Sequence, residues 1–336
     1  MIKVDVVGGG LSGFSTAISL KRHCRNINVV VHEKHKRIGY NHEGRRCGEA
    51  HSVEGEWKKW KPQGKSVFNE IRVVETVVGD KKYVMYRKPG TSCILNRQEF
   101  ICQLAREAER LGVEIWTGDK IHSLEDLQGE YIVDATGCPS TIKRELHLLH
   151  GITGMTYQQT LEESNYFISD TVKIIFMETP GYYWIFPRDP DRREINLGVG
   201  IIGKTSDNLK GMLEAFKKQH DIRGKINYVT GGLIPAGLQK PLKYDNVLFV
   251  GDAGVGTFPL TGQGIYRALI SGEIAGKAIA LGFPEKYPFL IKKMFIKWDI
   301  LGKSFVYMNQ VLKEVSGKMV LTVLQCLLNL QYKKIL

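Results

Sequence analysis

The feature that most constrains the fold lies at the start of the chain, where residues 2–13 have the sequence IKVDVVGGGLSG. A short apolar segment ends in Gly8-x-Gly10-x-x-Gly13, a helical pattern follows, and a second apolar segment ends at Glu33. A dinucleotide site needs this order. The first glycine permits a tight turn, the second admits a pyrophosphate, the third lets helix and strand pack closely, and the carboxylate binds ribose hydroxyls. The pattern predicts a Rossmann-like unit but does not distinguish FAD from NAD.

A second stretch, GVGIIG at residues 198–203, matches the same glycine spacing. Here the apolar residues alternate straight through the glycines, at Ile195, Leu197, Val199 and Ile201. Alternation of period two is typical of a strand and not of a strand-to-helix turn. We therefore expect a strand at this position and no nucleotide site.

Two later segments extend the nucleotide pattern. Residues 246–264, NVLFVGDAGVGTFPLTGQG, predict a buried strand, a carboxylate at its end and a glycine-rich helix start, and residues 131–137, YIVDATG, predict another strand and turn. A carboxylate there can bind a polyol hydroxyl, and a helix start can stabilise negative charge on a reduced ring. FAD has a ribityl chain and NAD has none, so these segments favour FAD. The candidate cofactor residues in them are Asp134, Gly137, Asp252, Pro259, Gly262 and Gly264.

Length and charge set further expectations. The 336 residues suggest about two domains. The net charge of +12 favours an anionic partner. Because no nucleic-acid-binding motif accompanies the charge, we do not expect nucleic acid as a partner. The stretch EWKKWK at residues 56–61 suits either a membrane interface or a solvated loop.

The six cysteines include no C-x-x-C pair, so the sequence does not predict a metal site. Scattered cysteines and an opening strand without a charged leader predict a cytoplasmic protein, held peripherally at the inner face of the membrane if it docks on one. His42 and His51 are expected in surface or loop positions.

The stretch GYYWIFPRD at residues 181–189 holds four aromatic residues within five positions, closed by Pro187. Side chains alternate in a strand, so Tyr182, Trp184 and Phe186 would share one face and Tyr183 the other. Such a face is either ordinary core or the wall of a pocket for an apolar ligand.

The three nucleotide segments, in this order, resemble the FAD domain of the p-hydroxybenzoate-hydroxylase-type flavoproteins, as does LNRQEF at residues 95–100, which holds Arg97. Within that group, GRRCGEA at residues 44–50 and Tyr182-x-Trp184-x-Phe186-Pro187 resemble the geranylgeranyl reductase family, which includes the archaeal digeranylgeranylglycerophospholipid reductases. Members use FAD to saturate isoprenoid double bonds. Two positions depart from the usual motifs: Gln263 stands between the loop glycines, and Ala50 ends the cysteine motif.

The resemblance implies an α/β fold with a Rossmann-like FAD-binding domain, an inserted β-sheet substrate domain and a short C-terminal helical region. The FAD-binding domain is expected at 1–60, 93–150 and 236–285, the substrate domain at 61–92 and 151–235, and the helical region at 286–336. The implied partners are a prenyl lipid substrate, an anionic membrane surface, and ferredoxin or NAD(P)H as electron donor.

The resemblance also places Cys47 beside the flavin. The neighbouring Arg45 and Arg46 would lower a thiol pKa, and reduction of an alkene needs a proton as well as a hydride. Cys47 is therefore the candidate proton donor and Glu49 its rival. The candidate cofactor residues are Gly8, Gly10, Gly13, Glu33, Arg45, Arg46, Cys47, Arg97 and the six named above, and the candidate substrate residues are Tyr182, Trp184, Phe186 and Pro187.

Two other functions fit the FAD segments. An FAD-dependent aromatic monooxygenase shares them but does not need the cysteine and aromatic motifs. A membrane-docked electron-transfer flavoprotein shares them and has no lipid chemistry.

Overall fold

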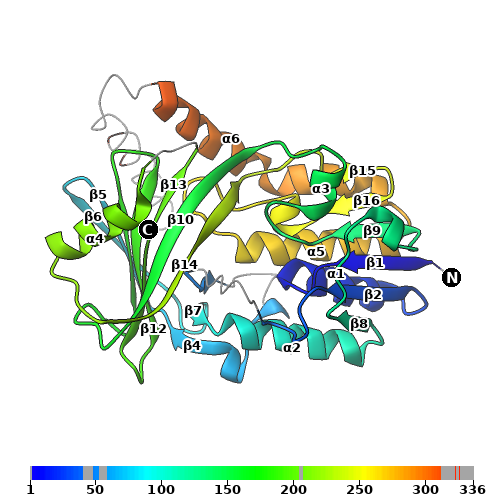
Figure 1. The fold of residues 1–336 in the computed structure, drawn as a ribbon, viewed down its shortest axis with the longest axis horizontal. Coiled ribbons are helices and arrows are strands. Elements are labelled where there is room, and N and C mark those ends of the chain that lie inside the picture. The colour runs from blue at the N-terminus through cyan, green and yellow to red at the C-terminus, as the bar shows by residue number, and fades with distance from the viewer. Residues whose placement is uncertain are drawn as a thin grey trace.

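The computed structural model describes residues 2–40, 48–52, 59–203 and 207–311, together with Thr322 and Gln325. The predictions for Arg45, Arg46 and Cys47 therefore lie outside the described residues, as does most of the C-terminal region beyond residue 311. The expected fold class is confirmed, with mixed α/β structure built on a Rossmann-like sheet (Figure 1).

A six-stranded sheet contains the N-terminal strand. All neighbouring strands in it are parallel except the first pair in the order given below. Because the strands are parallel, their carboxyl ends meet at one edge, which is where such sheets bind ligands. The strands, in spatial order, are β15 (Lys243–Tyr244), β16 (Val247–Phe249), β9 (Tyr131–Asp134), β1 (Lys3–Val7), β2 (Asn28–Glu33) and β8 (Glu114–Thr117).

Helices α1 (Leu11–His23) and α5 (Ile265–Ala280) pack against each other at unusually short range. A Cβ at Gly272 would lie 2.3 Å from the Ser12 carbonyl oxygen, and one at Gly276 would lie 2.5 Å from that of Thr16. The small residues therefore let the two backbones touch, which fixes the start of α1 at the sheet edge. Helix α2 (Arg97–Arg110) packs beside α1, and α3 (Thr141–Glu145) follows β9.

A seven-stranded sheet forms the other half of the molecule (Figure 1). One face is covered by α4 (Leu209–Gln219), whose Leu213 and Phe216 are buried against it, with Tyr183 stacked on Phe216 at 4.1 Å between ring centres. The strands, in spatial order, are β14 (Lys225–Ala236), β10 (Ile152–Glu162), β13 (Glu194–Ile202), β12 (Gly181–Asp189), β11 (Thr171–Phe176), β5 (Val73–Val78) and β6 (Lys81–Tyr86). GVGIIG lies within β13, so it is a strand as expected.

The chain passes between the two large sheets twice in each direction. After β2 it supplies β5 and β6 to the seven-stranded sheet and returns for β8, and after β9 it supplies β10–β14 and returns for β15. A small sheet of β3 (Ala50–Ser52), β7 (Ser92–Leu95) and β4 (Val67–Glu70) lies between them, and α6 (Tyr287–Val311) follows the last strands. The exact domain boundaries given by the sequence remain a prediction.

The described part of the EWKKWK stretch fits neither a membrane interface nor a solvated loop. Trp60 is buried in the main core, and its indole Nε1 donates to Glu273 Oε2 at 2.6 Å. The ammonium of Lys59 pairs with the same carboxylate. The indole therefore contacts neither membrane nor solvent, because a buried carboxylate on α5 gives its polar atom a partner. No helix in the described part of the chain is long and apolar enough to cross a membrane.

Candidate functional site

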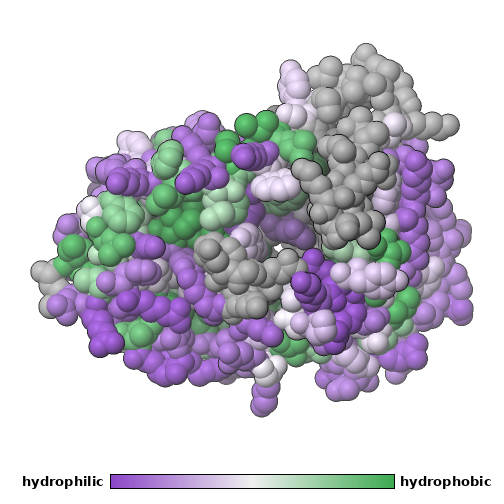
Figure 2. All heavy atoms as spheres, turned by 180° about the vertical axis from the view of Figure 1, so that it is seen from behind, coloured by the Kyte–Doolittle hydropathy of each residue, from purple (hydrophilic) through white to green (hydrophobic). Residues whose placement is uncertain are grey.

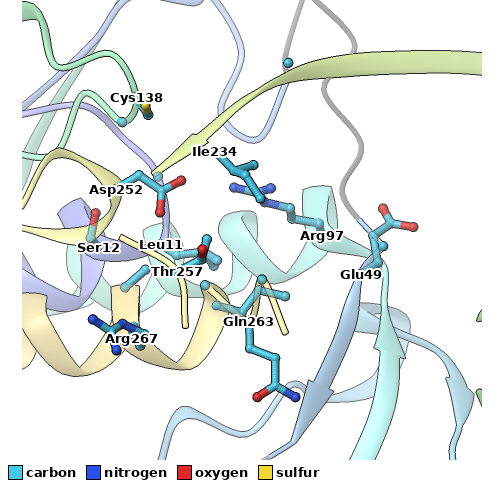
Figure 3. Close-up of a pocket in the computed structure, with 18 of the residues that line it drawn as sticks. Leu11, Ser12, Glu49, Arg97, Cys138, Ile234, Asp252, Thr257, Gln263 and Arg267 are labelled. Carbon is cyan, nitrogen blue, oxygen red and sulfur yellow. The ribbon is translucent and has the colours of Figure 1, made fainter. Parts of the chain in front are cut away.

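A cavity of about 1790 Å³ lies where the carboxyl edge of the six-stranded sheet meets the open face of the seven-stranded sheet (Figure 3). Its lining includes residues of β1, β2, β3, β7, β10, β12, β14, α1, α2, α5, α6 and the loop before α5. A pocket for one small ligand is usually about 300–1,000 Å³. This cavity therefore has room for a dinucleotide and a second molecule beside it.

The three glycines of the N-terminal pattern meet different surroundings. A Cβ at Gly8, whose φ is +112°, would lie 2.5 Å from the Ala135 carbonyl oxygen, and one at Gly13 would lie 1.9 Å from that of Gly8. A Cβ at Gly10 would have no described atom within 4 Å, and Gly10 lines the cavity. Gly8 and Gly13 thus serve the turn and the packing, whereas the space beside Gly10 is left for a ligand.

Glu33 ends β2 and faces the cavity. Its Oε2 accepts from the Gly9 backbone amide at 2.8 Å, and its Oε1 accepts from the His35 backbone amide at 2.8 Å. The carboxylate is therefore fixed in position before any ligand arrives. Binding of ribose hydroxyls by Glu33 remains a prediction.

His32, one residue earlier, was not singled out from the sequence. Its ring lies between two carboxylates, with Nδ1 2.7 Å from Asp119 Oδ2 and Nε2 3.3 Å from Asp5 Oδ1. Burial lowers the pKa of His32, but the attraction of the Asp5 and Asp119 carboxylates outweighs it and the net shift is upward. No sequence signal could have identified this histidine with its two carboxylates, because Asp5, His32 and Asp119 lie far apart in the chain.

Asp252 is the candidate for a polyol. Its carboxylate points into the cavity, on the side facing Arg97 and Ile234 (Figure 3), and the part of the chain that the structure describes gives it no hydrogen-bond donor. Burial raises its pKa, while Arg97 and Arg267 act in the opposite direction. A half-buried carboxylate that receives no hydrogen bond from the described residues favours a ligand that brings hydroxyl donors.

The two arginines near Asp252 are held differently. Asn96 caps α2 by accepting from the Glu99 amide at 3.3 Å, which starts the helix with Arg97 at the cavity. Arg267 on α5 donates to Asp299 Oδ1 at 2.9 Å and to backbone carbonyls of the preceding loop. Arg97 was predicted from its motif, whereas Arg267 was missed because its partner lies on α6.

The glycine loop before α5 is closed by its own backbone. The Phe258 amide donates to the Gln263 carbonyl at 2.9 Å, and the Gly262 amide donates to the Phe258 carbonyl at 2.8 Å. Gly262 has φ +64°, and it lines the cavity together with Gln263 and Gly264.

Three predicted cofactor residues are not brought to the cavity lining, and the first of them is Gly13, which packs against Gly8. Asp134 is fully buried and accepts from the Thr136 amide at 2.9 Å and from the Ser140 hydroxyl, so it holds the turn after β9. Pro259 packs under α6, where a Cβ at Gly302 would lie 2.6 Å from it. Gly137, in contrast, does line the cavity.

The aromatic residues of β12 divide as the alternation predicts. Tyr182, Trp184 and Phe186 line the cavity, and Tyr183 lies on the α4 side. Pro187 is not part of the cavity lining, because it follows Phe186 and so falls on the opposite face. The expected aromatic wall is therefore present without its proline.

Trp184 occupies a shaped recess. Its Nε1 donates to Gln158 Oε1 at 3.0 Å. On the paired strand β13, a Cβ at Gly198 would lie 2.1 Å from the indole Cζ2. The glycines of GVGIIG thus make room for this ring, which explains a pattern that looked like a nucleotide motif.

Tyr182 connects the wall to the glycine loop. Its phenol donates to the Thr261 carbonyl, one residue before Gly262. Burial raises the pKa of Tyr182 far above its usual range, so the hydroxyl remains a donor at all working pH values. The aromatic strand and the loop beside the nucleotide end therefore hold each other in position.

Glu49, the rival proton donor, lies across the cavity from Asp252 (Figure 3) and is engaged as an acceptor. Its Oε2 accepts from Arg188 Nε at 2.7 Å and from Asn196 Nδ2 at 3.1 Å, and Arg188 also pairs with Glu194. All of these groups are buried. A buried carboxylate that receives a guanidinium and an amide is suited to holding β3 against the sheet.

His51 is buried at the cavity, so the expected surface position is wrong. It belongs to β3, which pairs with β7, and burial lowers its pKa to about 4. Cys93 on β7 also lines the cavity, and burial raises its pKa to about 12. Both groups are therefore neutral near pH 7. Among the described residues, no cluster of three or more His, Cys, Asp or Glu side chains is placed to hold a metal ion.

Family models match two parts of the chain. The NAD(P)-binding Rossmann-like domain matches residues 6–58, and the geranylgeranyl reductase catalytic domain matches residues 154–233. The first covers the glycine turn and the second covers β10–β13 and most of β14, so the two matches fall on opposite sides of the cavity.

The chain is 26% identical to the digeranylgeranylglycerophospholipid reductase of Sulfolobus acidocaldarius, over 84% of this chain and 70% of that protein. It is 25% identical to digeranylgeranylglycerophospholipid reductase 2 of Methanopyrus kandleri, over 94% of this chain and 87% of that protein.

Among solved structures, a geranylgeranyl bacteriochlorophyll reductase-like protein of Thermoplasma acidophilum matches with a TM-score of 0.80 at 21% identity, over 96% of this chain and 90% of that one. The flavin-dependent halogenase CmlS matches with a TM-score of 0.67 at 16% identity, over 92% and 65%. These structures share the fold of this chain. The resemblance to the geranylgeranyl reductase family, indicated by the sequence motifs, is confirmed by the catalytic-domain match and the named relatives.

Proposed function

We propose that this protein is an FAD-dependent reductase that saturates isoprenoid double bonds of a prenyl lipid. The observation that carries the proposal is the single cavity, which joins a dinucleotide-type glycine turn at one end to a wall of three aromatic rings at the other. The geranylgeranyl reductase catalytic model and the named relatives support the same activity.

The described residues fit FAD at the nucleotide end. The space beside Gly10 and the start of α1 would receive the pyrophosphate, whose charge suits the unpaired amides of a helix N-terminus. Glu33 would take the adenosine ribose, and Asp252 would accept from the ribityl chain. When bound and reduced, FAD supplies a hydride for one carbon of the double bond.

The aromatic wall would hold the prenyl chain. Flat rings contact an apolar chain without hydrogen-bonding demands, and the polar atoms of Trp184 and Tyr182 are already used by Gln158 and Thr261. The wall therefore offers carbon surface to a substrate.

The other carbon of the double bond needs a proton. We assign its donor to Cys47, on the strength of the family motif and the adjacent Arg45 and Arg46. The next residue, Gly48, supports this position, because a Cβ there would lie 2.7 Å from the Phe186 ring of the wall. Glu49 is the weaker candidate, since Arg188 and Asn196 already donate to it.

We further propose a cytoplasmic location, peripheral binding to an anionic membrane surface, and an external electron donor, either ferredoxin or NAD(P)H. The net charge of +12 supports the anionic surface.

The test is anaerobic single-turnover oxidation of pre-reduced protein by a geranylgeranyl lipid, with products resolved by mass. Wild type should add two hydrogens per double bond and oxidise its flavin. Cys47→Ala should slow the reaction by about 10²–10⁴-fold if the thiol donates the proton, or less, with a changed position of the reduced double bond, if it only shapes the pocket. Cys102→Ala, on α2 and outside the cavity, is the matched control.

Two outcomes favour the rivals. Consumption of oxygen with an aromatic substrate and no lipid reduction would indicate a monooxygenase. Flavin redox cycling without either reaction would indicate an electron-transfer protein. Identical rates and products for Cys47→Ala and wild type would remove the cysteine from the mechanism.

A further inference from the structure

Helix α6 has an exposed face that mixes apolar and basic residues. Phe289 is 66% exposed, Ile300 60% and Trp298 52%. Large apolar residues at these exposures are unusual in such a concentration on one helix of a protein surface. The exposed apolar residues of α6 are Phe289, Met294, Trp298, Ile300, Leu301 and Tyr307.

The charges on α6 have one sign on its exposed surface. Lys292, Lys293 and Lys297 are exposed, and Lys303 is half-buried. The one acid of α6, Asp299, is buried and paired with Arg267. A helix with exposed lysines and large apolar side chains is the pattern of a segment that lies in the surface of an anionic bilayer.

The same helix forms part of the cavity wall. Met294, Phe295 and Trp298 line the cavity, and the Trp298 ring contacts Phe258 edge-on with 5.9 Å between ring centres. Met294, Trp298 and Leu301 are spaced four and three residues apart, so they lie in one row on the helix. Met294 and Trp298 in this row are exposed and also line the cavity, so the edge of the cavity reaches the surface on this side of α6. In the space-filling view, hydrophobic and hydrophilic residues stand side by side around a hollow in the face seen from behind (Figure 2).

We propose that α6 docks the protein on an anionic lipid bilayer and that the cavity opens to the bilayer beside Met294 and Trp298. A prenyl lipid could then reach the aromatic wall without leaving its membrane. The inference rests on the proposed lipid substrate, but the docking surface can be tested without any turnover. It assigns to α6 the membrane contact that the sequence suggested for EWKKWK, where Trp60 is buried.

The test is co-sedimentation of the flavin-loaded protein with vesicles. Wild type should bind vesicles of phosphatidylcholine mixed with phosphatidylglycerol and bind phosphatidylcholine alone much more weakly, and added salt should weaken the binding. Phe289→Glu/Ile300→Glu, which changes two exposed α6 residues outside the cavity lining, should bind at least about tenfold more weakly. The control pair Tyr86→Glu/Leu149→Glu changes exposed residues elsewhere and should bind like wild type.

A second pair of variants isolates the charge. Lys293→Glu/Lys297→Glu and Lys210→Glu/Lys218→Glu change the net charge equally, the first on α6 and the second on the exposed side of α4. Only the α6 pair should lose binding by about tenfold or more. Equal losses from both pairs would mean that net charge, and not this helix, governs binding, and the proposal would be wrong.

Turnover separates the docking proposal from the proposed function. With substrate dispersed in detergent, all variants should react like wild type, whereas with substrate in vesicles the α6 variants should be slow. If wild type reduces neither form, the proposed function fails while the vesicle result still decides the docking. Vesicle binding that survives both α6 changes, with or without an altered oligomeric state, would overturn the docking.

Discussion

Two stretches of this chain share one glycine pattern, but the absent side chains have opposite structural consequences. At Gly10 a Cβ would meet no described atom within 4 Å, so the missing side chain leaves space for a ligand. At Gly198 a Cβ would lie 2.1 Å from the Trp184 ring, so the missing side chain is replaced by a part of the protein itself. A glycine motif therefore reports a close approach, and only the neighbouring elements tell whether a cofactor or an indole approaches.

Among the substitutions that test this comparison, Gly10→Val should have the largest effect, and that effect is on flavin affinity. The new side chain would enter the space proposed for the pyrophosphate, so flavin affinity should fall by about 10- to 100-fold, the equivalent of 1–3 kcal/mol of overpacking. The melting temperature of the flavin-free protein should stay the same, because no described atom is in the way. Flavin titration by fluorescence and thermal unfolding measure the two effects.

Gly232→Val is the matched control for that experiment. Gly232 also has no described atom within 4 Å of its Cβ position and lines the cavity, but it lies on β14 at the sheet end. The Gly232→Val substitution should therefore leave flavin affinity unchanged. Undiminished flavin binding by Gly10→Val would remove the nucleotide assignment.

Gly198→Val tests the second stretch. A side chain here collides with the indole of Trp184, so the free energy of unfolding should fall by about 1–3 kcal/mol. The double variant Gly198→Val/Trp184→Ala should recover part of that loss, since the colliding ring is gone. Denaturant unfolding of the four proteins gives the coupling energy, and strict additivity would show that the ring does not fill this space.

Trp184→Ala addresses the wall directly. We expect turnover of a long prenyl substrate to fall by about tenfold, equal to 1.4 kcal/mol of activation free energy, while flavin remains bound. Removal of a core tryptophan costs about 3–5 kcal/mol and would collapse the melting temperature. Joint loss of flavin and of folding would therefore assign Trp184 to the core and not to a substrate wall.

The smallest predicted effect is a pH dependence of the free energy of unfolding, which arises from His32 on β2. The raised pKa of His32 means that its contribution to stability is present below its unfolded pKa of 6.5 and is lost as pH rises through the folded value. The free energy of unfolding should therefore decline above pH 6.5, by at most about 1.4 kcal/mol per pH unit. His32→Gln should flatten this slope, which unfolding titrations between neutral and alkaline pH can measure. An unchanged slope would mean that the Asp5 and Asp119 contacts do not bind the proton.

The sequence was sufficient to predict features that depend on residues close together in the chain. The turn at Gly8–Gly13, the carboxylate at Glu33 and the shared face of Tyr182, Trp184 and Phe186 all follow from local spacing. Arg267, His32 and the α6 residues were missed because their partners come from distant parts of the chain. Asp134, predicted to bind the cofactor, instead accepts hydrogen bonds from its own turn and does not line the cavity, because a carboxylate at a strand end can serve its own turn as well as a ligand.

The two excursions of the chain from the six-stranded sheet to the seven-stranded sheet bear on how such an enzyme can be re-engineered. The seven-stranded sheet takes β5 and β6 from one excursion and β10–β14 from another, and β11 pairs with β5 in parallel across the two. A chimera that borrows a relative's seven-stranded sheet must therefore replace both excursions at once, with four splice points. Exchanging only the longer one would pair a foreign β11 with the native β5, in a sheet that tolerates no slip in register.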